Sequence, residues 1–371
     1  MRILVLGGYG LFGGRISQRL ASDGDFEVIV AGRTIGKARA FIANTPSLAA
    51  RMQPLALDTC ATDFAERLAA LAPGIVIDTA GPFQSREMSV PRAALAAGAH
   101  CIDLADGRDY VQRIRTLDAQ ARAAGRLLVS GASSVPGLSA AVVAALQPRF
   151  SRLRHVEVGI SPGNRTERGL ATTQAILGYV GQPWRVWRDG RWQRVHGWQS
   201  LRRVDVEGVG PRWFARCEVP DLDLLPGRWP ALETCDFRAG LELQRMHFGL
   251  WLASWAVRAR VLRSMQPFAR RLLRISDGRR DAGSDVGMMH VDLRGDGADG
   301  KPLALRWELV AADGDGPQIP ATAAVLLARK LAAGQLADTG ARACLDLFGL
   351  EDYLAALSGF AIEARLHVLS G

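Results

Sequence analysis

Lysine is almost absent from this sequence of 371 residues, which contains only Lys37, Lys301 and Lys330. The formal net charge of +9 therefore comes almost entirely from arginine. A positive surface favours phosphorylated or carboxylated molecules, so we expect a small-molecule substrate and regard an anionic one as a candidate. Arginine and tryptophan alternate between Trp184 and Trp229, a pattern that could stack single-stranded nucleic acid. An antiparallel sheet with buried aromatic residues explains the pattern better, and we predict no nucleic-acid partner.

Cysteine is scarce and scattered, and no two cysteines form a C-x-x-C pair. This argues against a disulfide framework and a structural zinc site, and we expect no bound metal. The five cysteines are Cys60, Cys101, Cys217, Cys235 and Cys344. No uncharged apolar run reaches the roughly 18 residues that a membrane-spanning helix needs. The sequence opens with a strand and a glycine turn over residues 2–8 where a signal peptide would stand, so we expect a cytoplasmic location.

Several catalytic motifs are also missing. No tyrosine is followed by a lysine four residues later, which excludes the usual catalytic pair of short-chain dehydrogenases. Lys37 is followed by alanine where a P-loop requires serine or threonine. The H-E-x-x-H motif of metalloproteases and the G-x-S-x-G motif of serine hydrolases do not occur.

The length of the chain indicates two domains, because a single hydrophobic core stops growing at about 250–300 residues. In residues 1–150, short apolar runs alternate with amphipathic helical stretches, which predicts an α/β Rossmann domain with a doubly wound parallel sheet. The predicted strands are Ile3–Leu6, Glu27–Ala31, Gln53–Leu57, Ile75–Thr79, His100–Leu104 and Leu127–Ser130. Residues 151–371 group their strands, which predicts an α+β substrate domain with a mainly antiparallel sheet. Its C-terminal helices are candidates to pack back on the first domain.

A hairpin and a long helix are predicted in the second domain. Arg185–Val195 is typical of a hairpin, with Asp189-Gly190 at the tight turn. Leu250–Ile275 is predicted as one basic amphipathic helix that carries two tryptophans and six arginines. Such a helix can lie on an anionic membrane surface. We favour the alternatives, in which its apolar face packs inside the protein or in a homodimer.

A glycine-rich motif follows the first predicted strand. Gly8-Tyr9-Gly10-Leu11-Phe12-Gly13 fits G-x-G-x-x-G and opens an amphipathic helix, which is the context that dinucleotide binding requires. The glycines permit a tight turn and a close approach of the backbone to a pyrophosphate. The helix N-terminus supplies N–H donors and a favourable dipole for that anion. The motif therefore predicts a dinucleotide cofactor.

The end of the second predicted strand indicates which cofactor binds. Enzymes that use NAD usually place an acidic residue there to hold the ribose 2′-hydroxyl. This chain has Arg33 and Thr34 at that point and Lys37 one helical turn later, with no carboxylate available. Guanidinium and ammonium groups can pair with a 2′-phosphate instead. We therefore predict NADP(H), with ordinary surface charges as the alternative explanation.

Four segments together resemble the saccharopine dehydrogenase-like oxidoreductases. The segments are Gly7–Gly13, Ala80-Gly81-Pro82-Phe83, Asp103-Leu104-Ala105-Asp106-Gly107 and Ser134-Val135-Pro136-Gly137. A looser likeness follows at Gln318-Ile319-Pro320-Ala321-Thr322-Ala323. The resemblance implies an N-terminal NADP-binding Rossmann domain and hydride transfer. The chain differs from the family after the fifth strand, where Asp106-Gly107 stands in place of the family's Gly-Glu.

The remaining candidate residues follow predicted strands, where ligands sit in open parallel sheets. We expect Asp58, Ala80 and Gly81 to contribute to the cofactor site. Asp103 and Asp106 are the catalytic candidates, because a carboxylate there could orient the nicotinamide ribose, hold a substrate amine or relay a proton. Their alternative role is to cap a helix that begins near Arg108.

Three functions are compatible with these patterns. The first is an NADPH-dependent reductase of a small C=N, C=O or C=C substrate. The second is a lipid-linked, enoyl-type reductase, which an apolar groove beside Leu250–Ile275 would favour. The third is a non-catalytic NADP(H)-binding sensor or scaffold.

Overall fold

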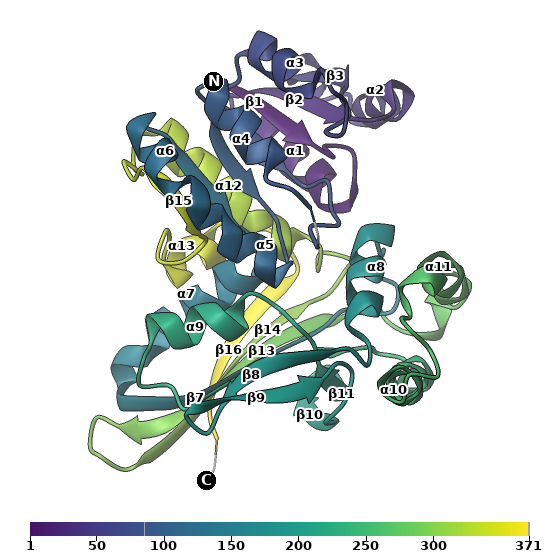
Figure 1. The fold of residues 1–371 in the computed structure, drawn as a ribbon, viewed down its shortest axis with the longest axis vertical. Coiled ribbons are helices and arrows are strands. Elements are labelled where there is room, and N and C mark those ends of the chain that lie inside the picture. Colours follow the sequence, from purple (N-terminus) through teal and green to yellow (C-terminus); the bar gives the residue numbers. More distant parts are fainter. Residues whose placement is uncertain (85, 370–371) are drawn as a thin grey trace. The chain divides into compact units, whose positions relative to one another are not determined.

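The computed structural model describes residues 1–84 and 86–369, which fall into two compact units (Figure 1). The first unit contains residues 1–138 and 318–348, and the second contains residues 139–317 and the chain from Gly349 onward. This division differs from the expected single boundary at residue 150. It does so because α7 (Ser139–Leu146) packs on elements of the second unit and because residues 318–348 return to the first.

The first unit is built on a parallel sheet of seven strands, as a Rossmann domain requires. In spatial order the strands are β15 (Gly340–Ala343), β6 (Leu127–Ser130), β5 (His100–Asp103), β4 (Ile75–Asp78), β1 (Arg2–Leu6), β2 (Glu27–Gly32) and β3 (Met52–Ala56). Six of these were predicted, and β15 is an additional edge strand. The order places the carboxyl ends of β1 and β4 side by side, since Leu6 pairs with Asp78.

Helices flank this sheet, as the βαβ connections demand. They are α1 (Leu11–Ser22), α2 (Ile35–Ala43), α3 (Phe64–Leu71), α4 (Ser89–Ala96), α5 (Arg108–Arg113), α6 (Asp118–Ala123) and α12 (Gln318–Ala332). α1 packs against α12, where the Arg19 guanidinium donates to the Thr322 hydroxyl at 2.8 Å. The first unit is therefore completed by a helix from late in the sequence.

The second unit contains a seven-stranded sheet that is antiparallel except where β12 pairs with β7. In spatial order the strands are β10 (Arg202–Val206), β11 (Gly210–Arg216), β12 (Thr234–Gly240), β7 (Phe150–Ser161), β13 (Gly287–Gly297), β14 (Pro302–Ala311) and β16 (Ile362–Val368). This confirms the predicted α+β domain with a mainly antiparallel sheet. Val204 and Val206 of β10 pack with Met288 of β13, so the sheet curls over one of its own faces.

A separate hairpin joins β8 (Pro183–Arg188) to β9 (Arg191–His196). Asp189 and Gly190 form its turn with φ values of +52° and +69°, the left-handed conformation that the sequence predicts there. The other helices of this unit are α8 (Leu170–Tyr179), α9 (Asp221–Arg228), α10 (Gln244–Arg258), α11 (Ala269–Asp277) and α13 (Leu350–Ala355).

The prediction of one helix over Leu250–Ile275 is wrong. Figure 1 shows two separate helices, α10 and α11, with irregular chain over residues 259–265 between them. Arg260 adopts a left-handed φ of +61°, which ends α10. Pro267 lies in the short 3-10 turn that leads into α11, a first-turn position where proline is tolerated.

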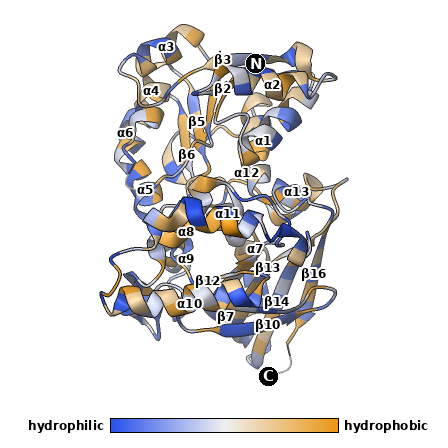
Figure 2. Ribbon diagram, turned by 90° about the vertical axis from the view of Figure 1, so that its right-hand side faces the viewer, coloured by the Kyte–Doolittle hydropathy of each residue, from blue (hydrophilic) through white to orange (hydrophobic). Residues whose placement is uncertain are grey.

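The two sheets differ in the polarity of their strands (Figure 2). β6 is hydrophobic at Leu127, Leu128 and Val129, because both faces of a parallel sheet are covered by helices. β10 is largely hydrophilic in the same view, although two of its valines are buried. Charged side chains on other strands of this sheet are buried, among them Asp236, Arg238 and Asp292.

Among the described residues, no helix is both long enough and apolar enough to cross a membrane.

Candidate functional site

The glycine-rich turn between β1 and α1 leaves open space in front of Gly10. Gly7 has a φ of +74°, which glycine adopts without strain. A Cβ atom on Gly13 would collide with the Gly7 carbonyl, so this glycine lets α1 pack close to β1. A Cβ on Gly10 would meet only the Gly7 carbonyl oxygen, at 3.1 Å. The backbone at Gly10 can therefore be approached closely by a bound group.

The N-terminus of α1 offers unpaired donors beside this space. Gly10 is the N-cap residue and has no side chain to cap the helix. Within the described part of the chain, no acceptor binds the backbone N–H of Leu11 or Phe12. Free N–H groups and the positive end of the helix dipole together favour an anion. Residues 8–13 thus form the cradle that a dinucleotide pyrophosphate needs, and NADP(H) fits this cradle.

Tyr9 links the glycine turn to the end of β2. Its hydroxyl accepts a hydrogen bond from the backbone N–H of Thr34 at 3.1 Å. Its ring lies so close to Gly32 that a Cβ there would come within 2.5 Å of the phenol. The sequence named Tyr9 as part of the motif but gave no sign of this contact.

The cations predicted to select the cofactor lie exposed beside Tyr9. Arg33, Thr34 and Lys37 are all exposed, and the first turn of α2 contains no acidic residue. Neither Arg33 nor Lys37 forms an ion pair with any carboxylate in residues 1–84 and 86–369. Two cations without counter-ions are therefore available at the end of β2, where a 2′-phosphate would bind.

The other predicted cofactor residues follow β3 and β4. The Asp58 carboxylate accepts the backbone N–H of Cys60 at 3.0 Å, so it stabilises the turn after β3. The Ala80 N–H donates to the carboxylate of Asp78 at 2.9 Å, and the Gly81–Pro82 peptide bond is cis. These residues stand at the same edge of the sheet as the glycine turn.

Asp103 is buried at the end of β5, where one of its oxygens accepts three hydrogen bonds. The donors are the Ser130 hydroxyl and the backbone N–H groups of Ala105 and Gly131, each at 2.9 Å. Burial raises the pKa of Asp103 to about 7, because these hydrogen bonds offset only part of the cost of removing its charge from water. Asp103 therefore joins the end of β5 to the end of β6.

Asp106 lies three residues further on and is half-buried. Burial raises its pKa, while a hydrogen bond from the Gln84 amide, at 3.0 Å, acts in the opposite direction. Neither aspartate caps the following helix, since the N-cap of α5 is Gly107 and no side chain bonds there. The helix-capping explanation for Asp103 and Asp106 is therefore wrong.

A buried ion pair that the sequence did not reveal lies behind these residues. The Arg86 guanidinium is 2.9 Å from the Asp78 carboxylate and donates to the Ala80 carbonyl at 3.0 Å. Tyr110 packs against Phe83, and its buried hydroxyl has no hydrogen-bond partner among the described residues. Of these residues, only those of the A-G-P-F segment were named in the sequence analysis. Arg86 and Tyr110 were not predicted, because their contacts join residues that are far apart in the sequence.

The second unit contains a network of paired charges inside its curled sheet. Glu157 on β7 accepts hydrogen bonds from Arg202, at 2.5 Å, and from Arg238, at 2.9 Å. Asp292 on β13 accepts two hydrogen bonds from Arg306, at 2.6 and 2.8 Å. Burial alone would raise the pKa of Glu157, but His290 and the two arginines outweigh it and bring the pKa to about 2. Glu157 is therefore ionised, and both carboxylates are paired with arginine.

The same network brings Glu157, His290 and Asp292 close enough together to resemble a metal site. Arginines already occupy the carboxylate oxygens, however, and they would repel a cation. The cluster is better described as an ion-pair network than as a metal centre.

Comparison with known proteins finds a family model that matches the first part of the chain. Residues 3–129 match the protein family described as "Saccharopine dehydrogenase NADP binding domain". A search of proteins with curated functions finds no significant match to the sequence.

Solved structures extend the likeness over the whole chain. The chain is similar to apo saccharopine dehydrogenase (L-Glu forming) from Saccharomyces cerevisiae, with a TM-score of 0.69, 14% identity and 99% of each chain covered. It is also similar to amine dehydrogenase from Mycobacterium smegmatis, with a TM-score of 0.50, 12% identity and coverage of 94% and 95%. Residues 3–129 therefore match the saccharopine dehydrogenase NADP-binding domain, as the motifs predict, and the fold of the chain is similar to that of saccharopine dehydrogenase.

Proposed function

We propose that the protein is an NADP(H)-dependent oxidoreductase that transfers hydride to a small C=N, C=O or C=C substrate. The observation that carries this proposal is the open cradle at Gly10 with unpaired N–H donors beside it. Arg33 and Lys37, which have no counter-ions, favour NADPH over NADH because they can pair with the additional 2′-phosphate. The family match over residues 3–129 supports the same cofactor.

Different residues of the chain would bind the cofactor, position the strand ends and hold a proton. The bound nicotinamide would supply the hydride, held through its pyrophosphate by residues 8–13 and through its 2′-phosphate by Arg33, Thr34 and Lys37. Asp103 would act as a positioning residue, because its three hydrogen bonds fix the ends of β5 and β6. Asp106 is the more accessible carboxylate, and burial raises its pKa, so it would hold a proton more readily than an exposed aspartate does.

A C=N bond is the first candidate among the substrates. One structural relative is named an amine dehydrogenase, and another is a saccharopine dehydrogenase. The lipid-linked alternative depended on an apolar groove beside Leu250–Ile275. The pocket that lies at the end of α10 is instead lined by arginines, so this observation does not favour a lipid substrate.

The proposal is tested first by binding and then by turnover. Titration calorimetry should give NADPH an affinity at least tenfold higher than NADH, which corresponds to about 1.4 kcal/mol. Gly10→Val should remove NADPH binding while the protein stays folded, because the added side chain fills the cradle. Gly249→Val, at an open position on α10, is the matched control.

NADPH consumption should then be measured with panels of imines, carbonyl compounds and enoyl compounds. Equal affinities for the two cofactors would contradict the NADP assignment. Unchanged NADPH binding by Gly10→Val would show that the cofactor binds elsewhere.

A further inference from the structure

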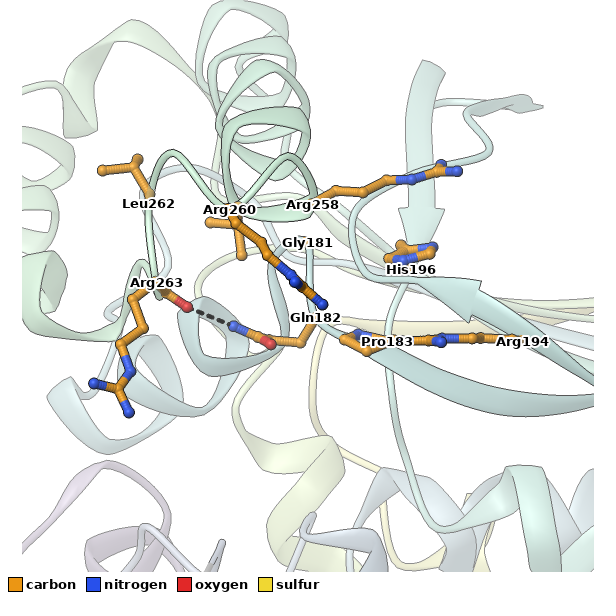
Figure 3. Close-up of a pocket in the computed structure, with 10 residues that line it drawn as sticks. Gly181, Gln182, Pro183, Arg194, His196, Arg258, Arg260, Leu262 and Arg263 are labelled. Carbon is orange, nitrogen blue, oxygen red and sulfur yellow. Dashed lines mark hydrogen bonds between the residues drawn. The ribbon is translucent and has the colours of Figure 1, made fainter.

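A cationic pocket lies in the second unit, between the β8–β9 hairpin and the end of α10 (Figure 3). Its volume is about 550 Å³, within the range of small-molecule sites. Four arginines and one histidine line it, and no carboxylate does. These residues are Arg194, His196, Arg258, Arg260 and Arg263. The sequence analysis noted the arginines after Trp255 but did not bring them together with β9.

No carboxylate of the described residues serves as a counter-ion for these arginines. Within residues 1–84 and 86–369, no carboxylate lies within 4.0 Å of the guanidinium of Arg194, Arg258, Arg260 or Arg263. Arg258 is instead held in place, because it donates to the Gln199 side chain at 2.8 Å and its guanidinium lies 5.0 Å from the centre of the Trp255 ring. The positive charge of the pocket is therefore left for something outside the described chain to neutralise.

Arg260 occupies a backbone conformation that favours glycine. Its φ is +61°, and its N–H bonds to the Val257 carbonyl at 2.9 Å, which ends α10. Glycine is the usual residue at this position of a helix end, because other side chains are strained there. Arg260 is one of several non-glycine residues with a positive φ in the described chain, which also include Ala72 at the end of α3.

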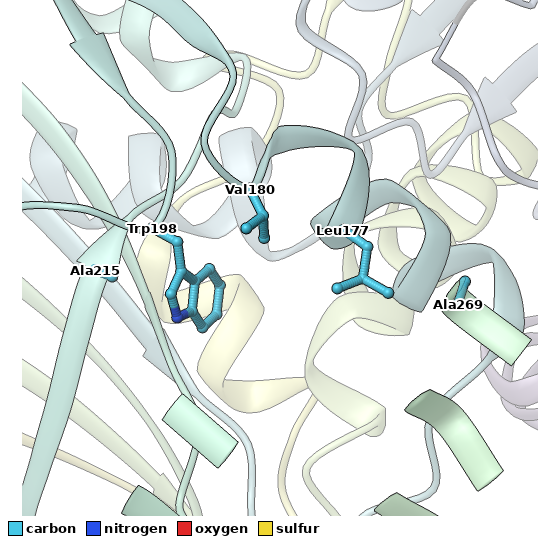
Figure 4. Packing of buried hydrophobic residues seen from close by; sticks show 5 residues of the cluster. All are labelled: Leu177, Val180, Trp198, Ala215 and Ala269. Atoms are coloured by element: carbon cyan, nitrogen blue, oxygen red, sulfur yellow. The ribbon is translucent and has the colours of Figure 1, made fainter. Parts of the chain in front are cut away.

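The backbone around the pocket is also held in place. The Gln182 amide donates to the Arg263 carbonyl at 2.8 Å, which ties the loop before β8 to the chain after α10 (Figure 3). Gly181 adopts a φ of +73°, and a Cβ there would press on Val257. The hydrophobic cluster behind this loop includes Val180 and Trp198, both buried (Figure 4). These contacts fix the backbone around the pocket, whereas the arginine side chains are exposed and, among the described residues, only Arg258 is held by a side-chain hydrogen bond.

Stabilisation of the helix end does not account for this arrangement. A helix C-terminus carries a charge of about −0.5, which one arginine would satisfy. Arg194 comes from a strand, not from α10, and still lines the same pocket. The four guanidinium groups therefore exceed what the helix dipole requires.

We propose that this pocket binds a small polyanion that carries phosphate groups. Guanidinium groups match phosphate oxygens in bidentate geometry, and several charges on the ligand are needed to balance four arginines. The volume suits a molecule of about the size of a diphosphate or a small phosphate ester. The site lies wholly within the second unit and does not depend on the proposed oxidoreductase activity.

The phosphate could come from a soluble metabolite or from a lipid headgroup. Large apolar side chains are exposed on the two helices nearby, including Leu252, at 63% of its surface, and Ile275, at 44%. Such side chains could enter a membrane interface while the arginines hold the headgroup. The experiment therefore contains one arm for each source.

His196 provides a local probe. Burial first, and then the charges of Arg258 and Arg194, lower the pKa of His196. A bound anion should raise that pKa by about one unit, because it favours the protonated imidazole. The signal is identified by NMR of histidine-labelled protein through its loss in His196→Gln. In Gly10→Val, which should not bind pyrophosphate at the glycine turn, the signal should move as it does in the original protein.

The soluble arm titrates pyrophosphate into the full-length protein. Arg194→Gln and Arg260→Gly should each weaken binding about tenfold or more, because each removes charge-assisted hydrogen bonds. Arg260→Gly should leave the melting temperature unchanged or raised, because glycine suits the left-handed backbone. Arg191→Gln, an exposed change on the same strand outside the pocket, should stay within about twofold of the original affinity.

The lipid arm measures co-sedimentation with phosphatidylcholine vesicles that contain or lack phosphatidic acid. Binding in either arm that Arg260→Gly weakens and Arg191→Gln does not would support the proposal and identify the source. The proposal is overturned if neither probe binds, if the pKa of His196 does not move, or if the pocket variants bind as the original protein does.

Discussion

Two carboxylates, one in each sheet, differ in how their ionised form is stabilised. Glu157 on the curled sheet is surrounded by arginines, and its pKa is about 2. Asp103 on the parallel sheet has three hydrogen-bond donors but no cation bonded to it, and its pKa is about 7. Both side chains lie among packed strands. Hydrogen bonds alone therefore leave the charged form of Asp103 disfavoured, whereas ion pairs stabilise that of Glu157.

The difference corresponds to two uses of buried charge. In the second unit, paired charges hold strands together that are not neighbours in the sheet, since Arg202 on β10 reaches both Glu157 and Asp292. In the first unit, Asp103 stays close to neutrality and can change its charge near physiological pH. Arg33 and Lys37 differ from both carboxylates. They are exposed, form no ion pair among the described residues, and can bind an anion.

Breaking the paired network should have the largest effect. Arg238→Met should lower the free energy of unfolding by about 3–5 kcal/mol, because it leaves Glu157 and Asp236 partly uncompensated. Arg191→Met, an exposed change of the same kind, should stay within about 0.5 kcal/mol. Urea denaturation at pH 7 measures both. A loss below about 1 kcal/mol for Arg238→Met would mean that the remaining arginines neutralise these carboxylates unaided.

The raised pKa of Asp103 should make the free energy of unfolding depend on pH. The folded protein holds a proton on Asp103 that the unfolded chain releases near pH 3.8, so this residue's contribution to stability is lost as pH rises from about 4 to 7. The loss approaches about 4 kcal/mol, because the pKa differs by about three units.

Asp103→Asn should remove that pH dependence and should be the more stable protein at pH 8. The asparagine oxygen can still accept the three hydrogen bonds. Denaturation from pH 4 to 8 gives the two profiles, with the exposed Asp25→Asn as control. Parallel profiles for Asp103→Asn and the original protein would show that Asp103 has an ordinary pKa.

The exposed cations should give the smallest effect of the three. Arg33→Asp should weaken NADPH binding by about 1.5–3 kcal/mol, because it removes a charge-assisted bond, and should leave NADH binding nearly unchanged. Arg39→Asp makes the same change of charge elsewhere on α2 and should affect both cofactors little. Calorimetry at two ionic strengths separates local pairing from general screening. An equal loss of both cofactors in Arg33→Asp would make Arg33 a structural residue.

The sequence predicted the parallel sheet closely, because each buried strand is a continuous apolar run between turns. All six predicted strands of that sheet end within one residue of the observed ends. The seventh strand, Gly340–Ala343, was missed because four residues that include a glycine and two alanines carry almost no strand signal. The prediction of a single helix over 250–275 failed because its periodicity continues across the break near Arg260.

The candidate site was also predictable only in part from the sequence. The glycine turn was predictable because its chemistry is local and its flanking strand and helix are strong. The bonds from Thr34 to Tyr9 and from Ser130 to Asp103 were not, because they join residues 25 and 27 positions apart. Such contacts depend on which strands become neighbours, and the order of strands in a sheet cannot be read from any one of them.

The return of α12 and β15 to the first unit has a consequence for biosynthesis. Residues 1–138 leave the ribosome long before residues 318–348, which supply that unit's edge strand and the helix that packs on α1. At a typical rate of about 5–20 residues per second, the intervening stretch of about 180 residues takes about 10–40 s. Throughout that interval the β6 edge has no neighbouring strand to pair with. The nascent dinucleotide-binding region therefore exposes an unpaired strand edge until its last strand arrives.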